Sequence, residues 1–305
     1  MERRRIGTLE VSAVGLGCNN FGRRIDEPAS AAVIHAALDA GINFFDTADS
    51  YGHTHSEEFL GRALAGRRAG ALIATKFGMP IEGRGQGARP EYVRQAAEDS
   101  LRRLGTDVID LYQLHKPDPQ TPIADTLGAL DELVRAGKVR EIGCSNFSAA
   151  QLREAQQAVR PGVQNQFSLL HRAPQLDLLP ECARGGVAFL PFFPLANGLL
   201  SGRYGGRFHC DEAPPEGSRF TAGAWGASAW NEANFAAVEA LRGFAAARGR
   251  SLLELAFGWL LAHPAVSSVI AGASRPEQAQ ANAAAAGWKL GAEDLAGIER
   301  LLQAA

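Results

Sequence analysis

Polar side chains that can carry chemistry stand at the ends of several short apolar runs that are predicted to be β-strands. They are Asp46, Lys76, His115, Ser145, Asn146 and Gln166. In a parallel barrel the carboxyl ends of all strands meet at one mouth, where active sites lie. We therefore expect these side chains to lie together, because a coincidence would have to recur at each separate strand end.

Four residues form a set that could protonate a carbonyl oxygen: Tyr51, Lys76, Asp46 and His115. A tyrosine with a pKa near 10 is a weak proton donor, and a nearby ammonium such as that of Lys76 favours its phenolate. Asp46 would keep a buried Lys76 charged. A ring N–H of His115 would align the carbonyl, and both donors would stabilise the negative charge that develops when hydride adds to carbon. This chemistry needs no metal.

Each of these residues also has a purely structural explanation. Asp46 could cap the segment that follows it, and Asn146 could cap a helix. Lys76 could extend to solvent, and His115 could be an ordinary core histidine. Their joint placement at separate strand ends favours the chemical interpretation.

The elements that must position these residues alternate along the chain. Strands are expected at 13–18, 43–46, 71–76, 108–114, 139–144, 162–166, 187–192 and 267–272. Helices are expected between them, at 29–40, 56–64, 90–104, 123–136 and 149–159. Eight β/α repeats predict an α/β fold, a (β/α)8 TIM barrel in a single domain spanning 1–305. A doubly wound sheet is the alternative, but its GxGxxG turn is incomplete, with Asn20 in place of the third glycine.

Two segments lie outside the repeat. Residues 3–12 are expected to form a hairpin that covers the bottom of the barrel. Residues 202–231 form a long segment rich in Gly, Pro and Trp, and loops of such length in compact proteins commonly serve as lids or binding segments. Capping-box spacing at Ser148–Gln151 and at Ser274–Glu277 marks two expected helix starts.

The composition is that of an ordinary globular protein, with 46% hydrophobic and 21% charged residues. A formal net charge of -2 gives no signature for nucleic acid or an anionic membrane. The N-terminus MERRRIGTLE has no signal-peptide core, and no apolar run is long enough to span a bilayer. Four scattered cysteines suit a reducing compartment. These features predict a cytoplasmic protein whose partners are small molecules.

At these motifs the chain resembles the aldo-keto reductase superfamily. GINFFDTADSYG at 41–52, with the Ser56-Glu57 pair after it, is similar to one signature segment, and SLRRLGTDVIDLYQLH at 100–115 is similar to a second. ATK at 74–76 and GKVREIGCSNF at 137–147 match further segments in order. The resemblance covers nearly the whole chain, from about residue 6 to about residue 282.

The resemblance implies an NADP(H)-dependent oxidoreductase that reduces aldehydes or ketones, with Asp46, Tyr51, Lys76 and His115 as the catalytic tetrad. It also implies a set of cofactor-binding residues around the barrel mouth. These are Ser145, Asn146, Gln166, Phe192, Pro194, Leu195, Gly272, Ser274, Arg275, Gln278 and Asn282.

The chain departs from the family pattern at two places. Phe192 stands where a tyrosine usually stacks on the nicotinamide, and Phe193 replaces the small residue that often follows. A lysine and an arginine that often bind the adenosine phosphate are replaced by Gly272 and Gln278. Arg275 at a helix start remains as the candidate for the 2′-phosphate, so NADP(H) is expected in preference to NAD(H), which the site could also accept.

Other readings of the same residues stay open. A redox-sensing protein that binds NADP(H) and turns over slowly is the first alternative, and a Schiff-base aldolase using Lys76 is the second. A metal-dependent hydrolase would need His53 and His55, which fall in a loop beyond Tyr51. The substrate pocket is expected to include Phe21, Phe77, Phe147 and either Trp225 or Trp230. Such walls predict aromatic or medium-length aliphatic carbonyl substrates.

Overall fold

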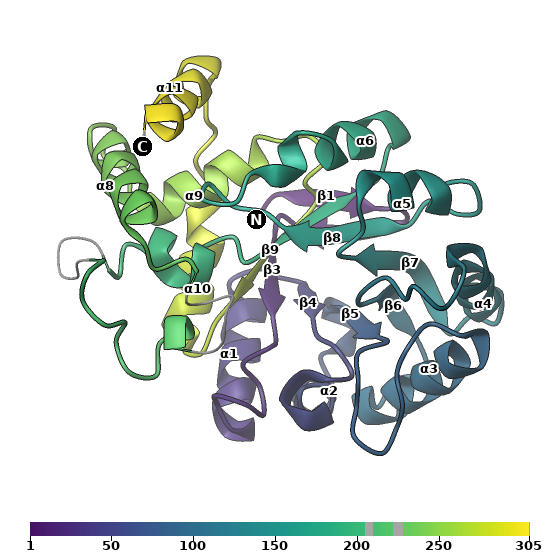
Figure 1. The fold of residues 1–305 in the computed structure, drawn as a ribbon. Helices are drawn as coiled ribbons and strands as arrows, with labels where there is room; N and C mark the ends of the chain where they lie inside the picture. The colour runs from purple at the N-terminus through teal and green to yellow at the C-terminus, as the bar shows by residue number, and fades with distance from the viewer. Residues whose placement is uncertain (205–209, 222–227, 305) are drawn as a thin grey trace.

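Eight parallel strands form a closed barrel in the computed structural model, which describes residues 1–204, 210–221 and 228–304 (Figure 1). The strands are β3 (Val14–Gly17), β4 (Phe44–Asp46), β5 (Leu72–Phe77), β6 (Ile109–Leu114), β7 (Val139–Ser145), β8 (Gly162–Gln166), β9 (Phe189–Phe192) and β10 (Val269–Gly272). They follow one another around the barrel in chain order, and β10 closes it by pairing with β3. The predicted (β/α)8 barrel is confirmed.

Helices surround the barrel and cover its outer face (Figure 1). They are α1 (Glu27–Asp39), α2 (His55–Ala63), α3 (Pro90–Leu104), α4 (Ile123–Arg135), α5 (Ala149–Ala155), α6 (Leu178–Gly185), α8 (Glu232–Ala246), α9 (Leu252–Leu261), α10 (Pro276–Ala285) and α11 (Ala292–Ala304). Short 3-10 turns lie at η1 (Tyr51–Thr54), η2 (Arg68–Gly70), η3 (Ala173–Gln175), η4 (Ala196–Ser201) and η5 (Arg219–Thr221).

Local side-chain chemistry fixes several helix ends. Asp26 caps α1 by accepting a hydrogen bond from the backbone of Ala29 at 3.0 Å. The predicted capping box between Ser148 and Gln151 forms at the start of α5. Gly105 ends α3 with a φ of 62°, a left-handed conformation that glycine adopts without a Cβ clash. These signals set the start of α1 and α5 and the end of α3.

The N-terminal hairpin, β1 (Arg3–Ile6) and β2 (Leu9–Ser12), covers the bottom of the barrel as predicted. Ile6, Leu9 and Val11 are buried there. Barrel residues that share this small core are Phe44, Ala74, Leu111, Leu190 and Ile270. The hairpin turn is held by Glu141, which accepts hydrogen bonds from the backbone and the hydroxyl of Thr8. The opposite end of the barrel carries the carboxyl ends of the strands.

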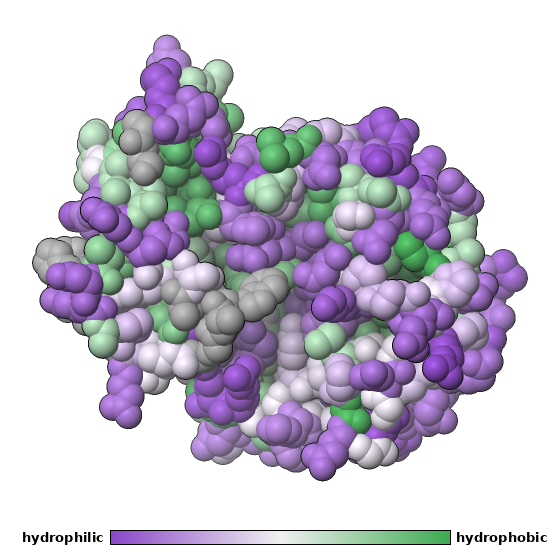
Figure 2. Space-filling model, in the orientation of Figure 1, coloured by the Kyte–Doolittle hydropathy of each residue, from purple (hydrophilic) through white to green (hydrophobic). Residues whose placement is uncertain are grey.

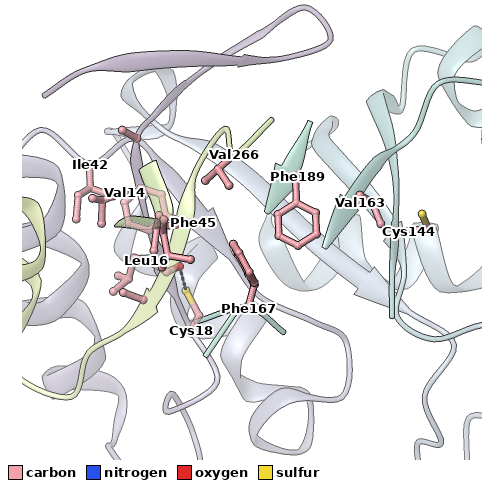
Figure 3. Packing of buried hydrophobic residues seen from close by; sticks show 14 of the residues in the cluster. Val14, Leu16, Cys18, Ile42, Phe45, Cys144, Val163, Phe167, Phe189 and Val266 are labelled. Atoms are coloured by element: carbon pink, nitrogen blue, oxygen red, sulfur yellow. Dashed lines mark hydrogen bonds between the residues drawn. The ribbon is translucent and has the colours of Figure 1, made fainter. Parts of the chain in front are cut away.

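The main hydrophobic core lies between the barrel and its helices (Figure 3). Phe167 packs there with its ring centre 4.9 Å from that of Trp259 and edge-on to Phe189. Truncation of a buried aromatic residue of this kind typically costs about 3–5 kcal/mol. The packing gives the strand ends a rigid base, which a precisely placed set of side chains requires.

The long segment after β9 is held by an aromatic cluster of Tyr204, Phe220, Trp230 and Phe235. The Trp230 indole N–H also donates to the backbone oxygen of Glu212 at 2.9 Å.

On the face shown in Figure 2, hydrophilic side chains predominate and hydrophobic ones are scattered. Within the described residues, no helix is both long and apolar enough to cross a membrane.

Candidate active site

The four predicted catalytic side chains meet at the mouth of the barrel. Asp46 ends β4, Lys76 lies near the end of β5, and His115 follows β6 directly. The Lys76 ammonium donates to Asp46 Oδ2 at 2.7 Å and to the backbone oxygen of Thr47 at 2.9 Å. It lies 5.1 Å from the ring centre of Tyr51, whose ring is edge-on to His115 with 5.6 Å between centres. The placement expected from the strand ends is therefore observed.

Tyr51 is placed by a tight backbone segment that follows β4. Its backbone N–H donates to Ala48 at 3.2 Å. The next three residues all have positive φ, and a Cβ on Gly52 would lie 2.2 Å from the backbone oxygen of Phe21. Such conformations are strained for most residues and persist only where surrounding structure holds them. The phenol is thereby aimed at Lys76 and His115.

Lys76 and Tyr51 shift each other's proton equilibria. Burial alone would lower the pKa of Lys76, but the Asp46 carboxylate and Tyr51 outweigh it and raise that pKa. Burial raises the pKa of Tyr51, against the ammonium of Lys76, which lowers it by charge and by a hydrogen bond. The net pKa of Tyr51 is above the ordinary value, because desolvation of the phenolate exceeds the effect of one ammonium. Tyr51 is therefore a protonated donor and Lys76 is a cation at neutral pH.

His115 is neutral in this environment. Burial, with a smaller contribution from the Lys76 charge, lowers its pKa to about 3. Its Nδ1 atom is buried without a hydrogen-bond partner among the described residues. The backbone oxygen of His115 accepts from the Asn146 amide at 3.0 Å, which fixes the loop after β6. A neutral imidazole can orient an oxygen atom without competing as a strong acid.

Two glutamines that the sequence reasoning missed complete the surroundings of Asp46. Gln164 Nε2 donates to Asp46 Oδ1 at 2.8 Å, and Gln113 Nε2 does so at 3.3 Å. Both glutamines are buried. The available signal was a polar side chain inside each of two apolar strands, at positions that face the barrel interior. The second oxygen, Oδ2, remains for Lys76.

A cavity of about 860 Å³ extends from the tetrad across the mouth of the barrel. Ten of the eleven predicted cofactor residues line it. They are Ser145, Asn146, Phe192, Pro194, Leu195, Gly272, Ser274, Arg275, Gln278 and Asn282. Its size is within the range of cofactor and substrate sites.

Gln166 is the exception, because it does not line the large cavity. It lines a separate, smaller cavity of about 300 Å³, whereas Gln164 lines the large one. Gln166 is the last residue of β8, so its side chain lies at the rim, where the chain leaves the barrel. Gln164, two residues earlier on the same strand, contacts Asp46.

Three residues predicted for the walls of the substrate pocket do not line the large cavity. Phe21 and Phe77 are fully buried in the main core, and neither lines the large cavity. Phe77 packs on Tyr112, with 4.7 Å between ring centres. Phe147 is also buried and contributes to the smaller cavity only. Apolar burial behind the strands, rather than ligand contact, accounts for these rings.

The two tryptophans considered for the same pocket are not found among the described residues that line the cavity. Trp225 lies outside the described residues. Trp230 packs within the aromatic cluster of the long segment and does not line the cavity. Residues that do line it near the tetrad include Cys18, Asn19 and Asn20 from the end of β3.

Arg219 is a further cavity residue that the sequence did not single out. Its Nη2 donates to Asn20 Oδ1 at 2.7 Å and to Asn19 Oδ1 at 3.0 Å. Burial, followed by the neighbouring charges of Arg24 and Arg23, lowers its pKa to about 10. Arg219 brings the long segment across to the β3 side of the mouth. Nothing in the sequence distinguished it from the chain's other arginines.

The start of α10 also lines the cavity. Arg275 is the N-cap residue and is exposed, and Pro276 occupies the first turn. The predicted capping box of Ser274 with Glu277 is wrong. Ser274 instead donates through its backbone N–H and its hydroxyl to Gln278 Oε1, at 2.8 Å and 3.1 Å. The helix begins one residue later than the box requires, which puts Gln278 opposite Ser274.

Competing chemistries lack support in this geometry. Within the part of the chain that the structure describes, no three His, Cys, Asp or Glu side chains come together as a metal site. His53 and His55 are both exposed. The Schiff-base alternative needs a neutral amine, but the raised pKa of Lys76 beside Asp46 keeps its ammonium protonated.

Comparisons with known proteins agree with this fold and site. The sequence profile described as Aldo/keto reductase family matches residues 13–303. Aldo-keto reductase YhdN from Bacillus subtilis (strain 168) is 34% identical, over 97% of this chain and 91% of that protein. The chain therefore belongs to the aldo/keto reductase family, whose members are oxidoreductases that act on carbonyl and alcohol groups with nicotinamide cofactors.

Solved structures are similar over the whole chain. Glycerol dehydrogenase AKR11B4 from Gluconobacter oxydans is 31% identical with a TM-score of 0.87, covering 99% of this chain and 95% of that one. The holo form of aldo-keto reductase AKR11C1 from Bacillus halodurans is 34% identical with a TM-score of 0.83, covering 100% and 97%.

Proposed function

We propose that this protein is an NADPH-dependent reductase of aldehydes and ketones, with Tyr51 as general acid. The observation that carries the proposal is the joined arrangement of Tyr51, the buried Lys76–Asp46 ion pair and neutral His115 at the inner end of one large cavity. This arrangement supplies a proton donor, a fixed positive charge and a neutral orienting donor within one site.

Each side chain has a separate role in the proposed reaction. A bound reduced nicotinamide would supply hydride to the carbonyl carbon. His115 orients the carbonyl oxygen, and Tyr51 transfers its proton to that oxygen as negative charge develops there. The Lys76 ammonium then stabilises the phenolate that remains on Tyr51. Asp46 keeps that ammonium charged and fixed, so the stabilising charge is in place before the reaction begins.

The residues present fit a dinucleotide with phosphate groups. Arg24, Arg203, Arg219 and Arg275 line the cavity, in which the acidic side chains are Asp46 at the inner end and Glu216. Among the described residues, the hydrogen bonds of the Arg219 guanidinium go to two neutral amide oxygens. A crowded guanidinium with a lowered pKa gains stability from a bound anion. Ser145, Asn146 and Gln164 lie beside the tetrad, where they would hold the nicotinamide carboxamide.

NADPH is the proposed cofactor in preference to NADH because Arg275 stands exposed at the start of α10. A guanidinium there would bind the 2′-phosphate, and the helix N-terminus adds a favourable partial charge. Phe192 lines the cavity and offers a ring face to the nicotinamide in place of the usual tyrosine. NADH lacks the 2′-phosphate and would lose only the contribution of Arg275.

The proposed substrates are small aldehydes and ketones. Because Phe21, Phe77 and Phe147 lie outside the cavity, the expected preference for aromatic carbonyls loses its support. Cys18, Asn19 and Asn20 give part of the wall a polar character, and a similar structure is a glycerol dehydrogenase. A small hydroxyaldehyde such as glyceraldehyde is therefore the first substrate to test, with benzaldehyde as the aromatic comparison.

Cofactor titration followed by steady-state assays tests the proposal. Quenching of tryptophan fluorescence should saturate with NADPH at lower concentration than with NADH. NADPH oxidation in the presence of an aldehyde should then be measurable by its loss of absorbance. Tight binding of NADPH without turnover of any carbonyl would favour a redox-sensing protein, and failure to bind either cofactor would refute the oxidoreductase proposal.

A further inference from the structure

A second buried acid lies in the same segment as Tyr51. Asp49 is 1% exposed, two residues before Tyr51 in the segment that follows β4. Both of its carboxyl oxygens are buried without a hydrogen-bond partner among the described residues. The backbone N–H of Ser50 is close enough to lower the carboxyl pKa slightly, but it does not reach hydrogen-bond geometry. A buried carboxylate in such surroundings is strongly disfavoured relative to a neutral acid.

Arg103, a cation near Asp49, already forms an ion pair with another acid, Glu57. Glu57 on α2 is fully buried and accepts from Arg103 Nε at 2.6 Å. The other Glu57 oxygen accepts from the Thr75 hydroxyl at 2.5 Å. Arg103 therefore neutralises Glu57, and a charged Asp49 would be a second anion beside a single cation.

The groups that face Asp49 come from every element packed around it. Lys76 lies on β5 and is engaged with Asp46, Glu57 lies on α2, and Arg103 and Tyr92 lie on α3. Tyr112 faces it from β6, with a pKa well above its ordinary value because of burial and then the Asp49 charge. Burial first and Glu57 second raise the pKa of Asp49 to about 8, against the opposing effect of Arg103.

The backbone of this segment connects Asp49 to the catalytic residues. The Asp49 N–H donates to the backbone oxygen of Lys76 at 3.0 Å, and the Thr47 N–H donates to that of Ala74 at 2.8 Å. These two bonds fasten the segment from Asp46 to Tyr51 along β5. A displacement of the Asp49 side chain would therefore also move Tyr51 and the backbone of Lys76.

We propose that Asp49, in its neutral protonated form, is a positioning residue that holds Tyr51 against Lys76, and that loss of its proton displaces this segment and limits activity at alkaline pH. The inference rests on the proposed reductase function. Among the described residues, the two cations that act on an ionised Asp49, Arg103 and Lys76, already form ion pairs with Glu57 and Asp46. The Asp49 carboxylate therefore moves toward water and carries the Tyr51 segment with it.

Protonation of Asp49 should also affect how the stability of the folded protein depends on pH. The unfolded chain loses the Asp49 proton near pH 4, whereas the folded protein keeps it to about pH 8. The folded state thus binds more protons across this interval, and its stability falls as the pH rises through it. Replacement by asparagine removes this contribution, because an amide does not titrate.

The test compares wild type with D49N in two measurements over about pH 5 to 10, a range that spans the raised pKa of Asp49. In steady-state assays, D49N should keep wild-type kcat near neutral pH within about threefold, and its alkaline loss of kcat should begin about one pH unit higher. In thermal unfolding, the Tm of D49N should decrease less than that of wild type as the pH rises toward 8. D39N is the matched control, because Asp39 is an exposed aspartate paired with Arg67.

The outcomes separate the proposals. The pH dependence of Tm could change in D49N while the loss of kcat at alkaline pH stays as in wild type. That result would give Asp49 a structural role only and would overturn the inference. Equal pH dependence of Tm in D49N and wild type would show that Asp49 is ionised, which also overturns it. If D49N does not fold, infrared titration of wild type decides, since a protonated carboxyl band must disappear as the pH passes about 8. A lack of reductase activity in wild type would refute the proposed function, while the Tm and infrared results would still report on the Asp49 proton.

Discussion

Lys76 and Asp46 form a buried ion pair in which the ammonium and one carboxyl oxygen are 2.7 Å apart and both side chains are at most 4% exposed. The other carboxyl oxygen accepts from two glutamine amides, so the pair is surrounded by hydrogen bonds. Buried charges of this kind are tolerated only when they are paired and well hydrogen-bonded. The ion pair therefore combines a structural constraint with the chemistry proposed for the site.

Removal of one partner should destabilise the fold more than removal of both. D46N and K76M each leave a buried group of the pair without its partner, and each should cost about 3–5 kcal/mol of unfolding free energy. The double variant D46N/K76M should recover a large part of that loss, since no uncompensated charge remains. Urea unfolding of the four proteins measures the coupling. Additive losses in the double variant would contradict a paired role.

The phenol hydroxyl of Tyr51 should matter for turnover and little for cofactor binding. Y51F keeps the ring but removes the proton donor, so kcat should fall about 10²–10⁴-fold. The dissociation constant for NADPH from fluorescence quenching should stay within about threefold of wild type, because one phenol oxygen contributes little to a large cofactor interface. Retention of most activity by Y51F would exclude tyrosine as the general acid.

His115 should contribute nothing to the pH dependence of activity around neutral pH. Its pKa of about 3 means that the folded enzyme holds a neutral imidazole through the usual assay range. The unfolded chain protonates its histidines near pH 6.5, so folding stability should decrease as the pH falls from there toward 3. H115Q should lessen this decrease in Tm. A histidine NMR signal from His115 that titrates near pH 6.5 in the folded protein would contradict the prediction.

Arg275 and Arg219 should affect the two cofactors differently. R275A should weaken NADPH binding much more than NADH binding, by about 10-fold or more, since a hydrogen bond to a charged group contributes about 1.5–3 kcal/mol. R219A should weaken both cofactors by similar factors if Arg219 contacts the diphosphate that they share. Arg219 contacts Asn19 and Asn20, whereas Arg275 is exposed at the start of α10.

Titrations of wild type and both variants with each cofactor make the comparison. R275M and R219M serve as controls that keep most of the side-chain length and remove only the charge. Equal weakening of NADPH and NADH by R275A would remove the basis for the proposed preference for NADPH.

The sequence by itself determined the barrel, the hairpin at its bottom and the positions of Asp46, Lys76 and His115. These features follow from local signals, because alternating apolar runs specify strands and helices, and the carboxyl ends of parallel strands lie at the mouth of the barrel. It also located the start of α10 to within one residue. Of the two predicted capping boxes, the one at Ser148 forms and the one at Ser274 does not.

Only the tertiary structure decided which side of each strand end faces the cavity. Gln164 rather than Gln166 contacts Asp46, and Phe21, Phe77 and Phe147 turn into the core. Arg219 reaches the mouth from far along the chain, through packing of the long segment. Such contacts and the pKa shifts at Asp49 and His115 depend on burial and on neighbours distant in sequence, which local residue patterns do not encode.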